Sequence, residues 1–124
     1  MARILVAEDE PDIRDIIDRA LSGAGHSVVT AADGAAALEQ MRGQKFDLLL
    51  TDIVMPIMDG VALALNVAKA HPDVRILMMT GYADQRDRAH NLDLLIHDIV
   101  LKPFTIGEIV LKVDEALSAP HRRG

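Results

Sequence analysis

Five short, largely apolar runs set the strongest limit on how this chain can fold. They occupy residues 4–7, 28–31, 48–50, 76–79 and 99–101. Runs of this length and composition are typical of strands in a parallel sheet that is covered on both faces. Segments with helical spacing lie between them. The alternation predicts an α/β fold, a doubly wound arrangement with a five-stranded parallel sheet between two layers of helices.

In the first segment between the runs, apolar residues repeat every three or four positions: Ile13, Ile16, Ile17, Ala20 and Leu21. This spacing is that of one face of a helix. Gly23 and Gly25 follow it and predict the helix end. We expect a second helix through Met41 and a third over residues 61–70, which Pro72 closes.

The last two helices differ in how clearly the sequence predicts them. Residues 84–91 are nearly all polar, with Ala89 as their one apolar member, so we expect a fourth helix that is short, shifted or mobile. Thr105 and Glu108, in contrast, have the spacing of a capping box at the start of a fifth helix. The apolar stripe of that helix consists of Ile106, Ile109, Val110, Val113 and Leu117.

Size and composition exclude several classes of protein. We expect the 124 residues to form one domain over residues 1–119, with a short tail at 120–124. Without cysteine there is no disulfide and no thiol chemistry, which favours the cytoplasm. The net charge of −6 and the three aromatic residues argue against direct binding of nucleic acid. No apolar run approaches the ~20 residues of a membrane span, and we expect no signal peptide before the first strand.

Charged and polar side chains stand where four of the predicted strands end. Glu8 and Asp9 follow the first run, Asp52 follows the third, Thr80 follows the fourth and Lys102 follows the fifth. The carboxyl ends of parallel strands meet at one edge of a sheet, where ligands bind. Carboxylates beside an ammonium group suit a hard divalent cation next to a transferable phosphoryl group. The sequence therefore predicts a metal and phosphoryl site at this edge.

Each of these residues also has an ordinary structural explanation. Acidic residues before Pro11 interact favourably with the dipole of the following helix. Asp52 could cap a helix or a turn, and the Thr80 hydroxyl could form a hydrogen bond with a backbone group. Lys102 could be an ordinary lysine at the point where a strand ends. Their joint occurrence at the same end of four strands is not well explained in this way.

These motifs, in this order, resemble the receiver domains of bacterial two-component response regulators. The likeness runs from residue 3 to about residue 117 and includes Met55-Pro56-Ile57-Met58-Asp59-Gly60 after Asp52, and Lys102-Pro103-Phe104. It implies a flavodoxin-like fold and the following roles. Asp52 would be the phosphoacceptor. Mg²⁺ would be held by Asp9, Asp52 and the backbone carbonyl of Val54, with Glu8 helping through water. Lys102 would pair with one phosphoryl oxygen, and the Thr80 hydroxyl would donate to another.

The resemblance also implies a function. A receiver accepts a phosphoryl group from a sensor histidine kinase or a histidine phosphotransfer protein and then changes its binding to another protein. We expect the output surface to be either the fourth helix with the fifth strand and fifth helix, or the face of the first and fifth helices. Ala7-Glu8-Asp9, residues 48–60 and Met79-Thr80-Gly81 further resemble the CpdR group of single-domain receivers. That group implies an adaptor for a AAA+ protease, engaged in the unphosphorylated form.

Three positions depart from the family pattern. Ile99 stands where the family often has an aromatic switch residue, and Tyr82 is either a substitute for it or an exposed loop residue. Val54 and Tyr82 stand two positions after Asp52 and Thr80, and neither offers an amide or carboxylate to orient an attacking water. We therefore expect the phosphorylated form to lose its phosphoryl group slowly by itself.

Single residues argue against two other functions. A metal-dependent phosphohydrolase with an aspartyl nucleophile carries a second aspartate two residues later, where this chain has Val54. A nucleotide-binding domain needs a glycine-rich turn after the first strand, which is absent. A pseudo-receiver would have the same fold and no phosphorylation, and the intact site residues argue against it: Asp9, Asp52, Thr80 and Lys102. We expect the histidines, which lack the spacing of metal ligands, to be solvated: His26, His71, His90, His97 and His121.

Overall fold

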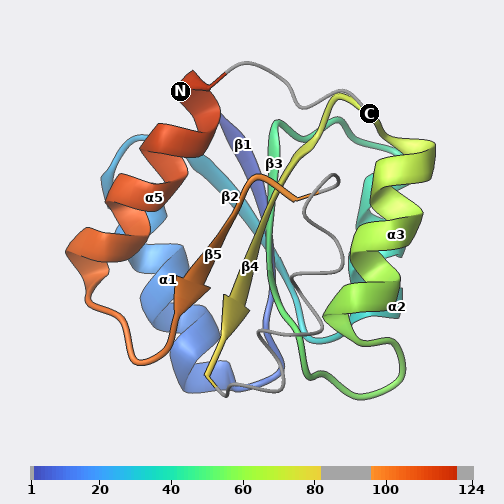
Figure 1. Cartoon of the computed structure of the whole chain (residues 1–124), viewed down its shortest axis with the longest axis horizontal. Helices are drawn as coiled ribbons and strands as arrows, with labels where there is room; N and C mark the ends of the chain where they lie inside the picture. Colours follow the sequence, from blue (N-terminus) through green and yellow to red (C-terminus); the bar gives the residue numbers. More distant parts are fainter. Residues whose placement is uncertain (1, 82–95, 120–124) are drawn as a thin grey trace.

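A computed structural model describes residues 2–81 and 96–119 of the chain. Its centre is a parallel five-stranded sheet with the strand order β2-β1-β3-β4-β5 (Figure 1). The strands are β1 (Arg3–Ala7), β2 (Ser27–Ala31), β3 (Leu48–Asp52), β4 (Arg75–Thr80) and β5 (Asp98–Leu101). All five contain the predicted apolar runs. Three of them (β1, β2 and β5) begin one residue before the predicted run, β3 continues for two residues beyond it, and β4 is longer by one residue at each end. The doubly wound α/β prediction is confirmed.

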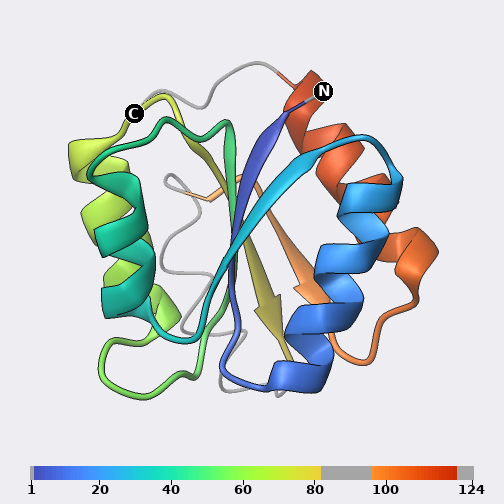
Figure 2. The ribbon, with the colours of Figure 1, turned by 180° about the vertical axis from the view of Figure 1, so that it is seen from behind.

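Helices cover both faces of the sheet, as the views from the front and from behind show (Figures 1 and 2). One face carries α1 (Pro11–Gly23) and α5 (Ile106–Ser118), which contact each other. The other face carries α2 (Gly34–Met41) and α3 (Gly60–Ala70), which are also in contact. The fourth helix predicted over residues 84–91 lies outside the described residues. No described helix is long and apolar enough to cross a lipid bilayer.

Two apolar cores flank the sheet, one for each layer of helices. Side chains alternate between them along every strand: Leu48 and Leu50 face α1 and α5, whereas Leu49 faces α2 and α3. All three are completely buried. Burial on both faces removes the usual alternation of polar and apolar residues, which is why these strands read as continuous apolar runs.

Side-chain caps fix where the helices begin. The Asp33 and Asp59 carboxylates accept backbone N–H groups at the starts of α2 and α3. The predicted capping box of α5 is confirmed, because the Thr105 hydroxyl accepts the Glu108 N–H while the Glu108 carboxylate accepts the Thr105 N–H. Pro11 occupies the first turn of α1, where its missing N–H is not needed.

Three predictions about side-chain burial were wrong. Ile16 and Ile106 belong to the expected apolar stripes but are 49% and 57% exposed. Periodicity identifies the face of a helix but not how far the surface beneath it extends: Ile106 starts α5, and Ile16 lies beside an open pocket. His26 was expected in solvent, yet its side chain is 9% exposed. Its Nδ1 accepts the Ala2 N–H at 3.2 Å, and its Nε2 lies 3.6 Å from an Asp114 oxygen.

Candidate functional site

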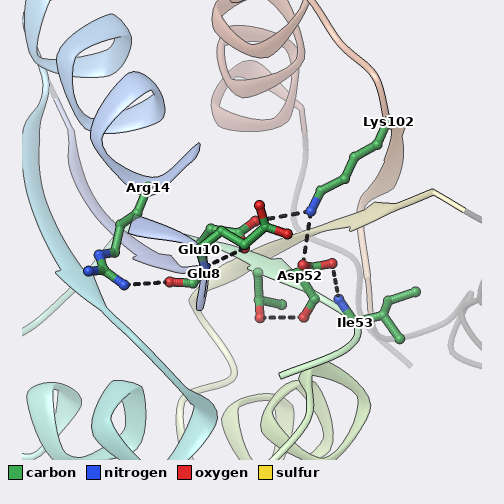
Figure 3. Close-up of polar contacts among 7 residues, drawn as sticks. Glu8, Glu10, Arg14, Asp52, Ile53 and Lys102 are labelled. Atoms are coloured by element: carbon green, nitrogen blue, oxygen red, sulfur yellow. Dashed lines mark hydrogen bonds and ion pairs between the residues drawn. The ribbon is translucent and has the colours of Figure 1, made fainter. Parts of the chain in front are cut away.

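Strand register brings three of the predicted residues to one point at the carboxyl edge of the sheet (Figure 3). Ala7 of β1 is the partner of Thr51 of β3, so Glu8 and Asp52, which follow them, are neighbours. Thr80 of β4 pairs with Leu101 of β5, and its carbonyl accepts the Lys102 N–H at 2.8 Å. Lys102 therefore leaves β5 beside the same edge, followed by a cis peptide bond to Pro103.

Lys102 bridges the two buried carboxylates. Its Nζ lies 2.9 Å from Asp52 Oδ2 and 3.1 Å from Glu8 Oε1. The second oxygen of Asp52 accepts the backbone N–H of Ile53 at 2.8 Å. Asp52 is thus held by a cation on one side and by the chain's own backbone on the other. These contacts fix its orientation at the end of β3.

Glu8 is the most enclosed member of the site. Its side chain is fully buried, and one oxygen accepts the Glu10 N–H at 3.1 Å. The Glu8 carbonyl accepts Arg14 Nη1 at 2.9 Å, which ties the end of β1 to α1. Burial raises the pKa of Glu8, and the nearby Asp52 charge adds to this, against the lowering effect of the Glu10 N–H and of Lys102. The Glu8 carboxylate is therefore easier to protonate than an exposed glutamate.

The pKa of Lys102 moves in the opposite sense from the one expected for a buried lysine. Burial by itself lowers the pKa of Lys102, but the hydrogen bond and the charge of Asp52, followed by those of Glu8, outweigh it and raise the pKa. The ammonium group therefore remains charged at neutral pH. A fixed positive charge beside Asp52 is what an incoming phosphoryl oxygen requires.

Three carboxylates at this edge form a donor set for a divalent cation. Glu8, Asp9 and Asp52 each offer one oxygen, and these oxygens all lie within 4.8 Å of one another. Asp9 is exposed, whereas the other two are buried. Oxygen ligands of this kind suit Mg²⁺, which binds to one or two carboxylates and keeps several waters. The residues therefore fit the magnesium ion that the sequence predicts.

An open pocket of about 680 Å³ gives access to this edge. Its polar lining consists of Asp9, Glu10, Asp52 and Lys102. Its apolar lining comes from α1, from the loop after β3 and from the loop before α5: Ile13, Ile16, Val54, Pro103 and Phe104. The Asp52 carboxylate thus lies in a hollow with apolar walls, large enough for a phosphoryl group and for part of a molecule that carries one.

The loop after Asp52 returns very close to the end of β3. A Cβ atom on Gly60 would lie 1.9 Å from the Asp52 carbonyl oxygen, so only glycine fits there. The Gly60 N–H donates to the Ile53 carbonyl at 2.7 Å and closes the loop. Gly60 is the last residue of the motif that follows Asp52, and this close approach is the reason that the position requires glycine. This closure holds Val54, which is half exposed and lines the pocket.

The predicted residues are not all equally close to the pocket. Glu8, Asp9, Asp52 and Lys102 come together as expected. Thr80 ends β4 and is fully buried, and among the described residues of that strand end Gly81 is the one that lines the pocket. Tyr82 lies outside the described residues.

Two contacts were missed by the sequence analysis. They are the Arg14 side chain on the Glu8 carbonyl and the Ile53 N–H on Asp52. The Arg14 contact joins a side chain to a backbone carbonyl six positions earlier in the sequence. The Ile53 contact is made by a backbone N–H group, and the sequence motif assigns no role to that residue. Ile99 contacts the core between the sheet and the layer of α2 and α3.

Comparison with known proteins identifies the family. The response regulator receiver domain matches residues 4–114. The response regulator receiver protein CpdR of Brucella abortus (strain 2308) is 38% identical over 119 residues, which are 96% of this chain and 99% of that protein. The DNA-binding transcriptional regulator NtrC of Escherichia coli (strain K12) is 36% identical over 115 residues, which are 93% of this chain but only 24% of NtrC.

Solved structures agree in fold. The chemotaxis response regulator CheY4 of Vibrio cholerae has a TM-score of 0.85 and 27% identity, with 94% of this chain and 98% of that one covered. The response regulator TrrA of Thermotoga maritima, crystallised in complex with Mg²⁺-BeF, has a TM-score of 0.84 and 32% identity, with 94% and 99% covered. Together with the acidic pocket, these likenesses confirm the resemblance seen in the motifs: the chain belongs to the family of response regulator receiver domains.

Proposed function

We propose that Asp52 is the phosphoacceptor of this receiver and that its phosphorylation switches the binding of a partner protein. One observation carries the assignment: the Asp52 carboxylate lines the pocket while it is held between the Ile53 N–H and the Lys102 ammonium. A receiver is a phosphoacceptor switch and not a classical enzyme. Membership of this family therefore argues against the alternative of a metal-dependent phosphohydrolase. The pseudo-receiver alternative is decided by the experiment below.

The transfer reaction follows from the placement of the carboxylate. An Asp52 oxygen attacks the phosphorus of a phosphohistidine in line with the phosphorus–nitrogen bond. That bond breaks, the imidazole nitrogen leaves with the electron pair, and an acyl phosphate forms on Asp52. Lys102 pairs with a phosphoryl oxygen and offsets its charge. The Thr80 hydroxyl, from the neighbouring end of β4, donates to a second phosphoryl oxygen.

Asp9, Asp52 and the backbone carbonyl of Val54 would hold Mg²⁺, with Glu8 acting through water. The bound ion supplies positive charge that offsets the repulsion between the carboxylates and the phosphoryl oxygens. Glu8 is suited to the outer position because its carboxylate is fully buried and already accepts the Glu10 N–H and a Lys102 hydrogen bond. Asp9 is exposed and is free to turn toward an ion in the pocket.

Receiver domains obtain their phosphoryl group from histidine kinases or phosphotransfer proteins. For the output we propose the surface of β5 and α5 together with the preceding segment. Leu101 and Leu111 are about half exposed there, beside the ion pair of Asp98 with Lys112. The face of α1 and α5 is the second candidate. Likeness to CpdR supports an adaptor role toward a AAA+ protease in the cytoplasm.

Incubation with Mg²⁺ and acetyl phosphate, followed by intact mass spectrometry, tests the acceptor. We expect the parent chain to gain one phosphoryl group, and Asp52→Asn to gain none, because the amide cannot act as the nucleophile. The asparagine variant keeps the shape of the side chain and is therefore the matched control. A parent chain that gains no phosphoryl group would leave the pseudo-receiver reading in place and overturn this proposal.

Co-purification tests the adaptor role separately. The unfoldase subunit of a AAA+ protease should be retained by immobilised Asp52→Asn, which stays unphosphorylated, and released when the parent is loaded with acetyl phosphate. Equal retention of the unfoldase by both forms would exclude the adaptor while leaving the acceptor assignment intact.

A further inference from the structure

The first turn of α2 lies directly against the loop between β3 and α3 (Figure 2). The Gly34 N–H donates to the Met58 carbonyl at 3.0 Å. A Cβ atom on Gly34 would lie 2.4 Å from that carbonyl oxygen and 2.9 Å from the Cβ atom of Met58. Non-bonded atoms do not approach so closely, so any larger residue at this position would displace either the helix or the loop.

The backbone of Gly34 does not itself require glycine. Among the described glycines, Gly25 alone has a positive φ angle, so Gly34 adopts a conformation that other residues also adopt. Glycine is a poor helix residue, because its backbone loses more conformational freedom on folding than that of alanine. The close approach to Met58 is therefore the physical reason for a glycine at the start of α2.

Helix α2 is held in place independently of this contact. The Asp33 carboxylate accepts the Ala36 N–H at 2.7 Å and caps the helix. Ala37 and Met41 are buried in the core between the sheet and the layer of α2 and α3. The loop, in contrast, lies at the surface, where the Ile57 side chain is 84% exposed. A clash at the start of α2 would therefore be relieved mainly by movement of the loop.

The loop itself has little slack. The Gly60 N–H donates to the Ile53 carbonyl at 2.7 Å and closes the loop into a ring. Within the ring the Met58 N–H donates to the Pro56 carbonyl at 2.7 Å, around Ile57 with its φ angle of +69°. Because backbone hydrogen bonds connect both ends of the ring, displacement of the Met58 carbonyl also moves the residues before it.

We propose that Gly34 is a positioning residue for the magnesium site. This inference rests on the proposed function, in which the backbone carbonyl of Val54 is a ligand of the ion. Val54 belongs to the closed ring and lies four residues before Met58. Since Gly34 lets α2 hold the Met58 carbonyl, it fixes the place of the Val54 carbonyl from outside the loop.

The Val54 carbonyl depends on such support more than the carboxylate ligands do. Mg²⁺ requires nearly ideal octahedral geometry. The Asp9 side chain is exposed and can rotate to follow an ion, whereas a backbone carbonyl turns only together with its loop. Groups that orient metal ligands typically contribute about tenfold to a hundredfold in metal affinity. Affinity for Mg²⁺ is therefore the property that reports most directly on the contact between Gly34 and Met58.

Gly34→Ala tests this role with the smallest possible side chain. Titration of the isotope-labelled protein with Mg²⁺, followed by NMR chemical shifts, measures the Kd and shows that the variant is folded. We expect the Kd of Gly34→Ala to be about tenfold or more above that of the parent. Gly43→Ala is the matched control, because no atom lies within 4 Å of the added Cβ. Its Kd should stay within about twofold of the parent value.

Two readouts separate positioning from a merely structural role. Ca²⁺ accepts variable coordination geometry, so its Kd should rise by about threefold at most in Gly34→Ala. Loading of Gly34→Ala from acetyl phosphate should be slow at low Mg²⁺ and return to within about twofold of the parent at saturating Mg²⁺. Loading that stays slow at saturating Mg²⁺ would show that the variant damages Asp52 or Lys102 and would overturn the positioning role.

Asp33→Ala weakens the same support without introducing a clash. Loss of the cap loosens the first turn of α2, while every ligand of the proposed site stays in place. We expect the Kd for Mg²⁺ to rise about threefold in this variant. Asp33→Ala decides the question if Gly34→Ala fails to fold.

The contrary results differ in what they overturn. Equal Mg²⁺ affinity of Gly34→Ala and the parent, or equal weakening of Mg²⁺ and Ca²⁺ binding, overturns the positioning role alone. An unchanged Kd in Asp33→Ala has the same meaning if that variant is the one that folds. A parent without Mg²⁺-dependent shifts contradicts the proposed metal ligands and the positioning role together. Failure of acetyl phosphate to load a parent that binds Mg²⁺ overturns the phosphoacceptor assignment, whereas the Kd values still decide the positioning role.

Discussion

Two lysines near β5 each contact a carboxylate at nearly the same distance, yet their surroundings differ completely. Lys102 Nζ lies 2.9 Å from Asp52 and also contacts the fully buried Glu8. Lys112 Nζ lies 2.8 Å from Asp98, whose side chain is 44% exposed. In both lysines the partner carboxylates raise the pKa, but only for Lys102 is burial the largest single influence, and it acts against them.

The comparison teaches that contact distance says little about what an ion pair contributes. An exposed pair typically adds about 0–1 kcal/mol to stability, because water screens it. Removing one partner of a buried pair costs about 3–5 kcal/mol, because a charge is left without compensation. The exposed pair of Lys112 and Asp98 connects α5 to β5 on the surface. Lys102 instead holds two buried acidic groups together at the centre of the site.

Replacing Lys102 by methionine should have the largest effect. Asp52 and Glu8 would be left buried without their cation, so we expect a loss of about 3 kcal/mol in the free energy of unfolding near pH 7. Burial already raises the pKa of Glu8, so this loss should decrease as the pH falls and the carboxylate takes up a proton. Urea unfolding at several pH values measures it. Lys112→Met is the matched control, with about 0.5 kcal/mol or less.

Magnesium should stabilise the cluster of Glu8, Asp9 and Asp52 and leave the exposed pair of Asp98 and Lys112 unaffected. At a Mg²⁺ concentration ten times its Kd, binding adds about 1.4 kcal/mol to the stability of the folded parent. Removal of the ion with a chelator should lower the melting temperature accordingly. Asp98→Asn should respond like the parent, whereas Asp9→Asn should respond much less. Equal responses of Asp9→Asn and the parent would show that the ion is bound elsewhere.

Hydrolysis of the acyl phosphate tests a further property of the buried cluster. Val54 lines the pocket with an apolar side chain that cannot orient a water molecule. In Val54→Asn the amide can do so, and we expect the rate of dephosphorylation to rise about tenfold, equivalent to about 1.4 kcal/mol in the barrier. The decay of the phosphorylated mass after removal of acetyl phosphate measures this rate. A parent that already decays within seconds would contradict the expectation of slow hydrolysis.

The smallest effect is expected from the exposed pair. Burial alone would raise the pKa of Asp98, but the hydrogen bond from Lys112 and the Ile99 N–H outweigh it and lower the pKa. The stabilisation is therefore fully present above the usual aspartate pKa of 3.8 and is lost as the pH falls below it. Asp98→Asn should lose about 0.2–0.5 kcal/mol at pH 7 and nothing at strongly acidic pH. Thermal unfolding across this range checks the sign.

The fold could be predicted from sequence because each strand is buried on both faces. Runs such as residues 48–50 have no polar alternation, and that composition occurs in few architectures besides a covered parallel sheet. The prediction of side-chain exposure was weaker. Ile16 carries the same periodic signal as Ile17, but one lines an open pocket and the other is buried, which depends on neighbours distant in the sequence.

Some features of the site could likewise be predicted from the sequence, and others could not. Strand ends located Glu8, Asp52 and Lys102, since parallel strands place their carboxyl ends together. The bridging position of Lys102 depends on strand order and register, which the sequence does not state. The positive φ of Ile57 had no signal at all, because glycine or asparagine usually marks such a position. His26 was misjudged for the same reason as Ile16: its partners, Ala2 and Asp114, come from elements far along the chain.

The central position of β3 has a consequence for how a signal can leave the site. This strand is the third of five, with β1 hydrogen-bonded on one side and β4 on the other. Backbone amides enclosed in this way exchange with solvent only when a large part of a domain opens. Asp52 therefore stands on a segment that has little freedom to move. Differences in hydrogen–deuterium exchange between the two phosphorylation states should appear in the loops that follow the strand ends, at residues 53–59 and 102–105, while β3 remains protected in both.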